Sequence, residues 1–369
     1  MIKVLNIITD TNIGGAGRLL INYLHCFDRT KFDIKVVLPV GAELKPLVEA
    51  EGYEVIETEN GRDKSFDRKA VGELIRIIKA EKPDIVHTHS SFSGKLAAYL
   101  CHVRRRFYTR HCAFEMPRRL TTFPGKQING FINNTLATDI VAVAQAAADN
   151  LTETGVDPKK ITVIINGVEP MRRTTKEEQT ELKHTLGISP HSFVCGISAR
   201  LESYKGHRYL LDTAKQVTDI HPETVFLIIG GGSEEDNLKK QAAELGITES
   251  VRFTGFVPDV APYYNIMDLN LNCSYGTETS SLALSEGMSL GVPAVVTSFG
   301  GNPCMITDGV NGFVVPEKNS SAMAEAILRI VENPAILKQL SEGALTEYRK
   351  KFTAAAMTRQ LENLYLEKK

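Results

Sequence analysis

Two glutamates stand eight positions apart in the segment 275–295, around the start of an expected helix. Glu278 precedes this helix, which Ser280 or Ser281 would cap, and Glu286 lies in its second turn. Carboxylates accept hydrogen bonds from paired hydroxyls, so two of them a helix turn apart suit a ligand with hydroxyls at both ends, such as a sugar nucleotide. Glutamates near a helix start also simply favour the helix dipole. Burial of this helix would leave Glu286 without water unless a group pairs with it, and its apolar residues are Leu282, Leu284, Met288 and Leu290.

Two cations mark the start of another expected helix. The apolar strand 194–197 is followed by Ser-Ala-Arg-Leu-Glu-Ser-Tyr-Lys-Gly, which places Arg200 and Lys205 just before the helix. Two fixed cations beside a helix N-terminus form an anion site, which would hold a diphosphate and neutralise its charge as it leaves. A solvated basic turn has the same pattern.

A glycine-rich turn follows the first expected strand. Residues 11–18 read Thr-Asn-Ile-Gly-Gly-Ala-Gly-Arg, and a helical run begins at 19. Gly14 and Gly15 would let the backbone approach a ligand closely, and the helix N-terminus would offer free N–H groups to a phosphate. The spacing differs from the dinucleotide fingerprint G-x-G-x-x-G, and a tight turn alone also explains these glycines.

Taken together, these loops resemble the retaining glycosyltransferases of family 4, whose E-x7-E pattern is met by Glu278 and Glu286. The resemblance extends over most of the chain. It includes Gly14-Gly15, the strand end 84–89, the segment 166–169, Arg200 with Lys205, the glycines 230–232, the segment 253–255 and the segment 291–293. It implies an α/β protein of the GT-B fold, with two Rossmann-like doubly wound domains facing a central cleft and a C-terminal helix packing back on the N-terminal domain.

The resemblance also implies roles for individual residues. Glu278 would bind donor sugar hydroxyls, Glu286 the nucleotide ribose, and Arg200 with Lys205 the diphosphate. The other donor-binding residues implied are Gly14, Gly15, Gly255, Ser280, Ser281 and Leu282. His89 would face the donor sugar and the acceptor, which makes the expected catalytic set His89, Arg200, Lys205 and Glu278. The acceptor-side candidates are His111, Arg110 and Arg118.

One motif departs from the family pattern. Family members often have Gly-Gly-x-Pro-Glu after the strand that follows E-x7-E, whereas this chain has Gly-Gly-Asn-Pro-Cys at 300–304. Cys304 therefore supplies no carboxylate, and we do not interpret it as a nucleophile. No D-x-D pattern occurs in the sequence, which fits chemistry without a metal or other cofactor, in which Arg200 and Lys205 replace the divalent ion.

The elements that must position these residues follow a doubly wound pattern that occurs twice. Short apolar runs alternate with helical segments, as a parallel sheet covered on both faces requires. The runs are 4–8, 34–38, 85–87, 140–143, 161–165, 194–197, 225–229, 251–253 and 294–297. The charged stretch 172–183 is the expected linker, so we expect an N-terminal domain of residues 1–170 plus a C-terminal helix 352–369, and a nucleotide-sugar domain of residues 171–351.

Composition limits the function classes and the cellular compartment that we expect for this protein. The balance of 43 Lys and Arg against 44 Asp and Glu disfavours a general nucleic-acid binder. The six cysteines show no CxxC pair and are expected to be reduced thiols. The sequence opens without a secretory leader pattern and has no apolar stretch of transmembrane length, so we expect a cytoplasmic protein that is at most peripheral at the inner face of the membrane.

A local basic patch lies within 104–126, where aromatic residues alternate with cations. Its cations are Arg104, Arg105, Arg106, Arg110, Arg118, Arg119 and Lys126, and its only acid is Glu115. It would attract anionic lipid headgroups or a lipid-linked phosphate, or it is a solvated loop of the acceptor domain.

The expected activity is retaining transfer of a hexose from a nucleotide diphosphate, with a UDP-sugar favoured, to a hydroxyl of a glycan or lipid-linked acceptor. Polysaccharide or glycolipid synthesis at the cell surface is the expected setting. The alternatives are a GT-B-like epimerase or phosphorylase, and a nucleotide-sugar-binding scaffold without turnover.

Overall fold

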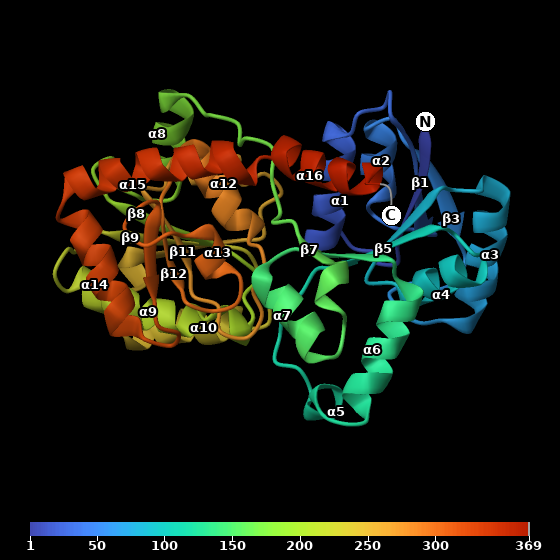
Figure 1. The fold of residues 1–369 in the computed structure, drawn as a ribbon. Helices are drawn as coiled ribbons and strands as arrows, with labels where there is room; N and C mark the ends of the chain where they lie inside the picture. The colour runs from blue at the N-terminus through green and yellow to red at the C-terminus, as the bar shows by residue number, and fades with distance from the viewer. Residues whose placement is uncertain (368–369) are drawn as a thin grey trace. The chain divides into compact units, whose positions relative to one another are not determined.

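The computed structural model describes residues 1–367 and divides the chain into two compact units (Figure 1). The first unit comprises residues 1–167 together with the C-terminal segment from residue 354, and the second comprises residues 168–353. Each unit is an α/β structure built on one parallel sheet. No helix among residues 1–367 is both long enough and apolar enough to cross a bilayer.

The first unit has a seven-stranded parallel sheet in the order β3-β2-β1-β4-β5-β6-β7. Its strands are β1 Ile2–Ile8, β2 Phe32–Pro39, β3 Glu54–Thr58, β4 Ile85–His89, β5 Arg105–Arg110, β6 Asp139–Ala142 and β7 Ile161–Val163. The strand order reverses between β1 and β4, whose last residues, Ile8 and His89, are paired in register. Ligands of such sheets bind beyond the carboxyl ends of the strands at this reversal.

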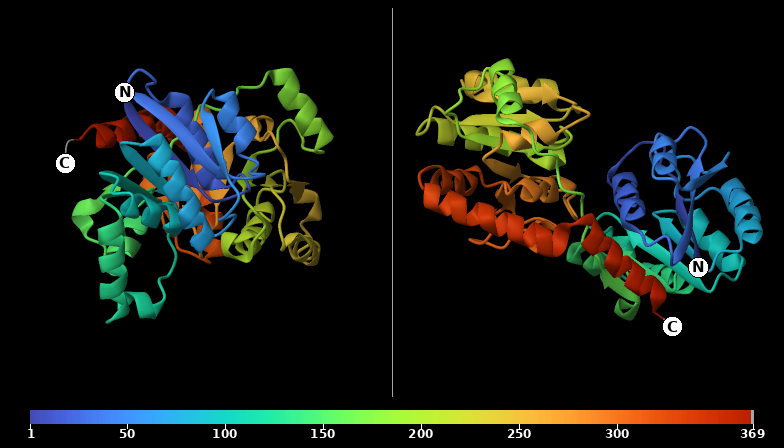
Figure 2. Two further views of the ribbon diagram at one scale, coloured as in Figure 1. Left: turned by 90° about the vertical axis from the view of Figure 1, so that its right-hand side faces the viewer. Right: turned by 90° about the horizontal axis from the view of Figure 1, so that it is seen from above.

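Helices cover both faces of this first sheet. One face packs on α1 Gly15–Cys26 and the C-terminal helix α16 Ala354–Leu366, which lie side by side (Figure 2). The other face packs on α3 Arg68–Glu81 and α4 Phe92–Leu100. The remaining helices are α2 Lys45–Ala50, α5 Arg118–Thr121, α6 Gly125–Leu136 and α7 Gln145–Glu153.

The C-terminal helix belongs to the first unit, as the family resemblance implies, and its apolar side is buried there. Met357, Leu361, Leu364 and Tyr365 are buried in the same core as the helix α1. Replacing one such large buried side chain by alanine typically costs about 2–5 kcal/mol, so this helix is an integral part of the first unit.

The second unit has a six-stranded parallel sheet in the order β10-β9-β8-β11-β12-β13. Its strands are β8 Val194–Ser198, β9 Val225–Ile229, β10 Val251–Gly255, β11 Leu269–Asn272, β12 Ala294–Thr297 and β13 Gly312–Val315. Its helices are α8 Lys176–Thr185, α9 His207–Thr218, α10 Glu235–Glu244, α11 Ala261–Asn265, α12 Leu282–Leu290, α13 Asn302–Met305, α14 Ser320–Val331 and α15 Pro334–Glu347. The strand order reverses between β8 and β11, so the loops after these two strands share one ligand-binding edge.

The stretch 172–183, which we predicted to be a linker, contains part of the helix α8. Thr175 accepts a hydrogen bond from the Glu178 backbone N–H, and the Glu178 carboxylate accepts one from the Thr175 backbone N–H. This capping box starts a helix in a sequence whose charge suggested an open linker.

Candidate functional site

Glu278 is held at the carboxyl edge of the second sheet by three hydrogen bonds to one of its oxygens. Its Oε2 accepts from Lys205 Nζ at 3.0 Å, Asn272 Nδ2 at 2.9 Å and Ser274 Oγ at 3.1 Å. Asn272 ends β11, and Ser274 lies in the loop that follows. Glu278, Asn272 and Ser274 are all buried. None of these three bonds uses Oε1, so the second carboxylate oxygen keeps its capacity to accept from a ligand hydroxyl.

The backbone around Glu278 is fixed by the glycine pair after β12. Gly300 has φ 61°, and a Cβ placed there would lie 2.1 Å from the Glu278 carbonyl oxygen. That carbonyl also accepts from the Gly301 backbone N–H at 3.3 Å. Gly300 and Gly301, the two glycines of the motif that differs from the family pattern, therefore support the Glu278 backbone. Cys304, the last residue of that motif, is half-buried in α13.

Lys205 ends a 3-10 turn, Ser203–Lys205, that leads into α9. Gly206, which follows, has φ 77°, and a Cβ there would lie 2.0 Å from the Cys273 carbonyl oxygen. This close approach brings the loop after β8 against the loop after β11, and so brings Lys205 to Glu278. The helix α9 begins without a side-chain cap, which leaves N–H groups at its start for an anion.

Arg200 lies in the same loop but is exposed, and it donates from Nη2 to the Tyr204 hydroxyl at 2.8 Å. The structure therefore brings only Lys205 into direct contact with Glu278, and it leaves Arg200 on the open side of the loop. His207, the first residue of α9, is buried, and burial lowers the pKa of its ring to about 4.

The helix α12 presents Glu286 as its sequence predicts. Ser281 is the N-cap, and its hydroxyl accepts from the Leu284 backbone N–H at 3.4 Å. Leu284 is buried, whereas Leu282 and Glu286, four positions apart, are half-buried. Glu286 is thus less enclosed than the apolar run suggested, and it lies on the more open side of the helix.

Glycines also shape the neighbouring strand ends. Gly230, after β9, has φ 133°, and a Cβ there would lie 2.1 Å from the Ala199 carbonyl oxygen. Its backbone N–H donates to the Gly255 carbonyl at 2.9 Å. Gly255 ends β10 with φ 67°, and a Cβ there would meet nothing within 4 Å, so its backbone conformation requires glycine although packing does not.

In the first unit, His89 and His111 form a hydrogen-bonded pair. His89, the last residue of β4, is 1% exposed, and its Nδ1 lies 3.0 Å from Nε2 of His111. Its Nε2 lies 3.3 Å from Oδ1 of Asn6, a buried residue of β1. Burial holds the pKa of His89 well below its usual range and lowers the pKa of His111 to about 4, so both rings are neutral at pH 7. His89 is enclosed, and the half-buried His111 is the more accessible of the two.

The glycine turn lies at the same edge of the first sheet. Gly14 is the N-cap of α1 and supplies no side-chain cap. Both Gly14 and Gly15 are exposed, and a Cβ at either position would meet nothing within 4 Å inside the protein. Packing within the first unit therefore does not require these glycines.

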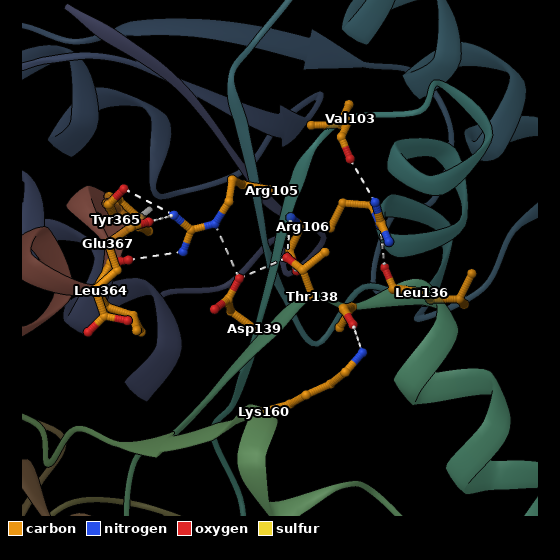
Figure 3. A network of polar contacts seen from close by, with 11 residues as sticks. Val103, Arg105, Arg106, Leu136, Thr138, Asp139, Lys160, Leu364, Tyr365 and Glu367 are labelled. Atoms are coloured by element: carbon orange, nitrogen blue, oxygen red, sulfur yellow. Dashed lines mark hydrogen bonds and ion pairs between the residues drawn. The ribbon is translucent and has the colours of Figure 1, made fainter. Parts of the chain in front are cut away.

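The structure corrects the predicted membership of the basic patch, because two of its cations bond within the first unit. Arg105 donates from Nε to Asp139 Oδ2 at 3.3 Å and from Nη2 to the Leu364 carbonyl at 3.0 Å (Figure 3). Arg106 donates to the carbonyls of Val103 at 2.7 Å and Leu136 at 2.9 Å (Figure 3). These two cations hold the first unit together and do not form a docking surface.

Arg110 is half-buried, and its Nε donates to the Cys112 carbonyl at 3.0 Å. Arg104, Arg118 and Arg119 are the exposed arginines of this segment. The outward-facing part of the patch is therefore smaller than the sequence suggests.

A known sequence-family profile matches most of each unit. The profile described as "Glycosyltransferase Family 4" matches residues 13–172, and "Glycosyl transferases group 1" matches residues 178–347. The chain is a glycosyltransferase of the family 4 type. The resemblance to the family 4 glycosyltransferases is thereby confirmed.

Curated relatives of this glycosyltransferase match most of its length. The UDP-Gal:alpha-D-GlcNAc-diphosphoundecaprenol alpha-1,3-galactosyltransferase of Escherichia coli is 27% identical over 310 residues, 82% of this chain and 80% of the relative. The alpha-monoglucosyldiacylglycerol synthase of Acholeplasma laidlawii is 28% identical over 317 residues, 80% of this chain and 78% of the relative. Among solved structures, Anabaena Alr3699/HepE in complex with UDP has a TM-score of 0.85 at 21% identity, with 99% of both chains covered. The expected GT-B fold is thereby confirmed.

Sequence reasoning missed two residues that touch Glu278 in this glycosyltransferase, Asn272 and Ser274. The strand β11 alternates Leu and Asn, so it did not show the continuous apolar run by which we predicted the other central strands. Had this strand been recognised, the rule that ligand chemistry lies at the carboxyl ends of strands would have drawn attention to both.

Proposed function

We propose that this glycosyltransferase moves a hexose from a UDP-sugar to a hydroxyl of a glycan or lipid-linked acceptor, in polysaccharide or glycolipid synthesis at the cell surface. The observation that carries the proposal is the Glu278 carboxylate, fixed by Lys205, Asn272 and Ser274 with Oε1 outside those three bonds. The E. coli relative is named for UDP-Gal and alpha-D-GlcNAc-diphosphoundecaprenol, and the Anabaena chain was solved with UDP.

In this proposal, the second unit holds the donor. Oε1 of Glu278 accepts from hydroxyls of the donor sugar, and Glu286 accepts from the ribose. The diphosphate binds Lys205, Arg200 and the N–H groups at the start of α9. The remaining contacts with the donor come from residues at the same sheet edge, namely Gly255, Ser280, Ser281 and Leu282.

The chemistry follows from these charges. As the sugar–phosphate bond breaks, negative charge grows on the departing diphosphate, and two fixed cations stabilise it without a metal ion. A phosphate oxygen of the leaving group takes the acceptor proton on the same face of the sugar, so the anomeric configuration is retained. The protein contributes position and charge and forms no covalent bond to the sugar.

The acceptor side belongs to the first unit. His111 is half-buried beside His89, and a neutral imidazole can accept a hydrogen bond from a hydroxyl or donate one to it. We assign His111 to contact with the ligand and His89 to positioning the His111 ring, with Arg110 and Arg118 as further acceptor-side candidates. Gly14 and Gly15 are assigned to the donor, as the family resemblance implies. A lipid-linked acceptor would bring the protein to the inner face of an anionic membrane as a peripheral protein.

The test is donor turnover in the presence and absence of acceptors. Purified protein is first screened by thermal shift with UDP, GDP and their sugars, because a ligand that binds only the folded state raises the unfolding temperature. The stabilising donor is then incubated with lipid and glycan acceptors, and the release of nucleotide is measured. Acceptor-dependent UDP release supports the transferase. Binding of the stabilising donor without turnover on any acceptor would favour a scaffold. Turnover of that donor without an acceptor would favour an epimerase or a phosphorylase.

A further inference from the structure

Large apolar side chains are exposed together on one projecting part of the first unit, residues 118–131, called here the α5–α6 tip. The exposed fractions are 82% for Phe123, 73% for Phe131 and 57% for Ile128. Figures 1 and 2 show α5 and the start of α6 standing away from the sheet of the first unit. Clustered apolar residues in contact with water mark an interaction surface.

The helix α6 has one anchored face and one open face. Asn129 Nδ2 donates to the Thr154 carbonyl at 2.8 Å, and Asn133 Oδ1 accepts from the buried Lys95 Nζ at 2.9 Å. Gly130 lies between these contacts, and a Cβ there would be 2.2 Å from the Gly155 carbonyl oxygen. This side of the helix is fixed to the body of the unit.

The open face of α6 carries apolar residues where a solvated helix would carry charges. Ile128 and Phe131, three positions apart, lie next to each other on this face. Since the helix is held from behind, these side chains cannot turn inward to a core. Phe123, in the turn before the helix, extends the apolar surface toward α5.

The same tip is positively charged. Arg118 and Arg119 are exposed on α5, and Lys126 is half-buried in the first turn of α6. The sequence 116–138 contains no aspartate or glutamate. In the sequence these cations flank the exposed Phe123, whereas Arg105 and Arg106 bond within the first unit.

We propose that the α5–α6 tip docks on an anionic lipid bilayer, with Phe123, Ile128 and Phe131 entering the interface and the cations facing lipid phosphates. An apolar surface flanked by Arg and Lys has the chemistry of an interfacial membrane element. A second copy of the chain fits less well, because two such tips would bring like charges together. The inference rests on the proposed function in one respect: a lipid-linked acceptor would be located in the bilayer, so the enzyme would have to bind there to reach it.

The experiment is vesicle co-sedimentation of the full-length protein. Vesicles of pure phosphatidylcholine are compared with vesicles of equal parts phosphatidylcholine and phosphatidylglycerol, at low and at high salt. We expect binding to the anionic vesicles that falls as salt rises, since ions screen the attraction. Absence of binding at low salt, or equal binding to both vesicles, overturns the proposal.

Two variants separate the apolar and charged contributions. The Phe123→Ser/Phe131→Ser variant is expected to bind anionic vesicles at least about tenfold more weakly, and Arg118→Glu/Arg119→Glu is expected to lose the preference for anionic lipid. The matched controls in the second unit are Ile220→Ser, at an apolar side chain 58% exposed, and Lys240→Glu, at an exposed lysine; both should bind like the wild type. Wild-type binding by the tip variants overturns the proposal.

Two further measurements keep the outcomes distinct. Analytical ultracentrifugation without lipid tests the second-copy reading: a wild-type dimer that Phe123→Ser/Phe131→Ser converts to monomer would overturn the membrane assignment. UDP binding by thermal shift reports on the proposed function separately. Vesicle binding without UDP binding would support the tip and count against the donor site, and the reverse would support the donor site alone.

Discussion

The Lys205 ammonium lies 3.0 Å from Oε2 of Glu278, and both side chains are largely enclosed at the carboxyl edge of the second sheet. The pair joins the loop after β8 to the loop after β11, the strands between which the sheet order reverses. A cation held here by a carboxylate keeps its place without a ligand. In the proposed donor site, Lys205 is therefore already positioned for a diphosphate, and Oε1 of the same carboxylate is assigned to the donor sugar.

Replacing either loop cation should weaken nucleotide binding. Lys205→Ala or Arg200→Ala removes a charge-assisted bond to the diphosphate, which is expected to cost about 1.5–3 kcal/mol, or roughly 10- to 150-fold in the Kd for UDP. Turnover should fall further, because charge develops on the leaving group in the transition state. Isothermal titration with UDP measures the effect, and Lys240→Ala serves as an exposed lysine control. If UDP affinity stays at the wild-type level in both variants, these cations are not in the donor site.

The residues behind Glu278 should matter for turnover more than for nucleotide binding. Asn272→Ala and Ser274→Ala each remove a donor to Oε2 and let the carboxylate rotate. Since neither side chain is assigned to the nucleotide, we expect unchanged UDP affinity and a kcat lower by roughly fivefold, in line with about 1 kcal/mol for one positioning hydrogen bond. Steady-state kinetics separate kcat from KM. A loss of UDP affinity as large as that of kcat would mean that the loop itself had collapsed.

The two glutamates should be distinguishable by ligand. Glu286→Ala should weaken UDP and UDP-sugar alike, because the ribose occurs in both. Glu278→Ala should spare UDP and weaken the UDP-sugar, because its assigned partners are sugar hydroxyls. Parallel titrations with both ligands make the comparison. Equal losses for UDP and UDP-sugar in Glu278→Ala would contradict the assignment.

The fold could be predicted because its signals are local and repeated. Each apolar run chosen from the sequence overlaps a strand, and the runs 225–229 and 294–297 match β9 and β12 at both ends. The runs 140–143 and 161–165 extend past the ends of β6 and β7. Four strands were missed: β3 and β5 carry charged residues, β11 alternates with Asn, and β13 has only a three-residue apolar run, 313–315, after Gly312. Parallel pairing with neighbours overrides these weak propensities, and a single sequence does not display that pairing.

The site could be predicted only in part. Lys205 and Glu278 were found by residue type and spacing, but their contact depends on Gly206 packing against the Cys273 carbonyl, a long-range approach that no local pattern shows. The extent of the basic patch was predicted wrongly for a different reason. A run of arginines does not reveal whether each guanidinium faces water or, like Arg105 and Arg106, bonds to carbonyl groups of its own unit.

Three histidines of the first unit, the buried His87 and His89 and the half-buried His111, make its stability depend on pH. Burial lowers the pKa of His87 to about 3 and of His111 to about 4, and it holds the pKa of His89 well below its usual range. The unfolded chain binds these protons near pH 6.5 and the folded chain does not. Between about pH 6.5 and pH 4, the unfolded state therefore carries more protons, and the folded state loses stability as the pH falls.

Scanning calorimetry across that pH range should show the first unit losing about 1.4 kcal/mol of unfolding free energy per pH unit for each such histidine. His111→Gln keeps a polar group beside His89 but removes one titrating ring, so its curve should be shallower by about that slope. His184→Gln, at an exposed histidine of the second unit, is the matched control and should reproduce the wild-type curve. A His111→Gln curve parallel to the wild type would show that His111 binds a proton equally well in the folded state, and would remove the basis for treating it as a neutral ligand contact.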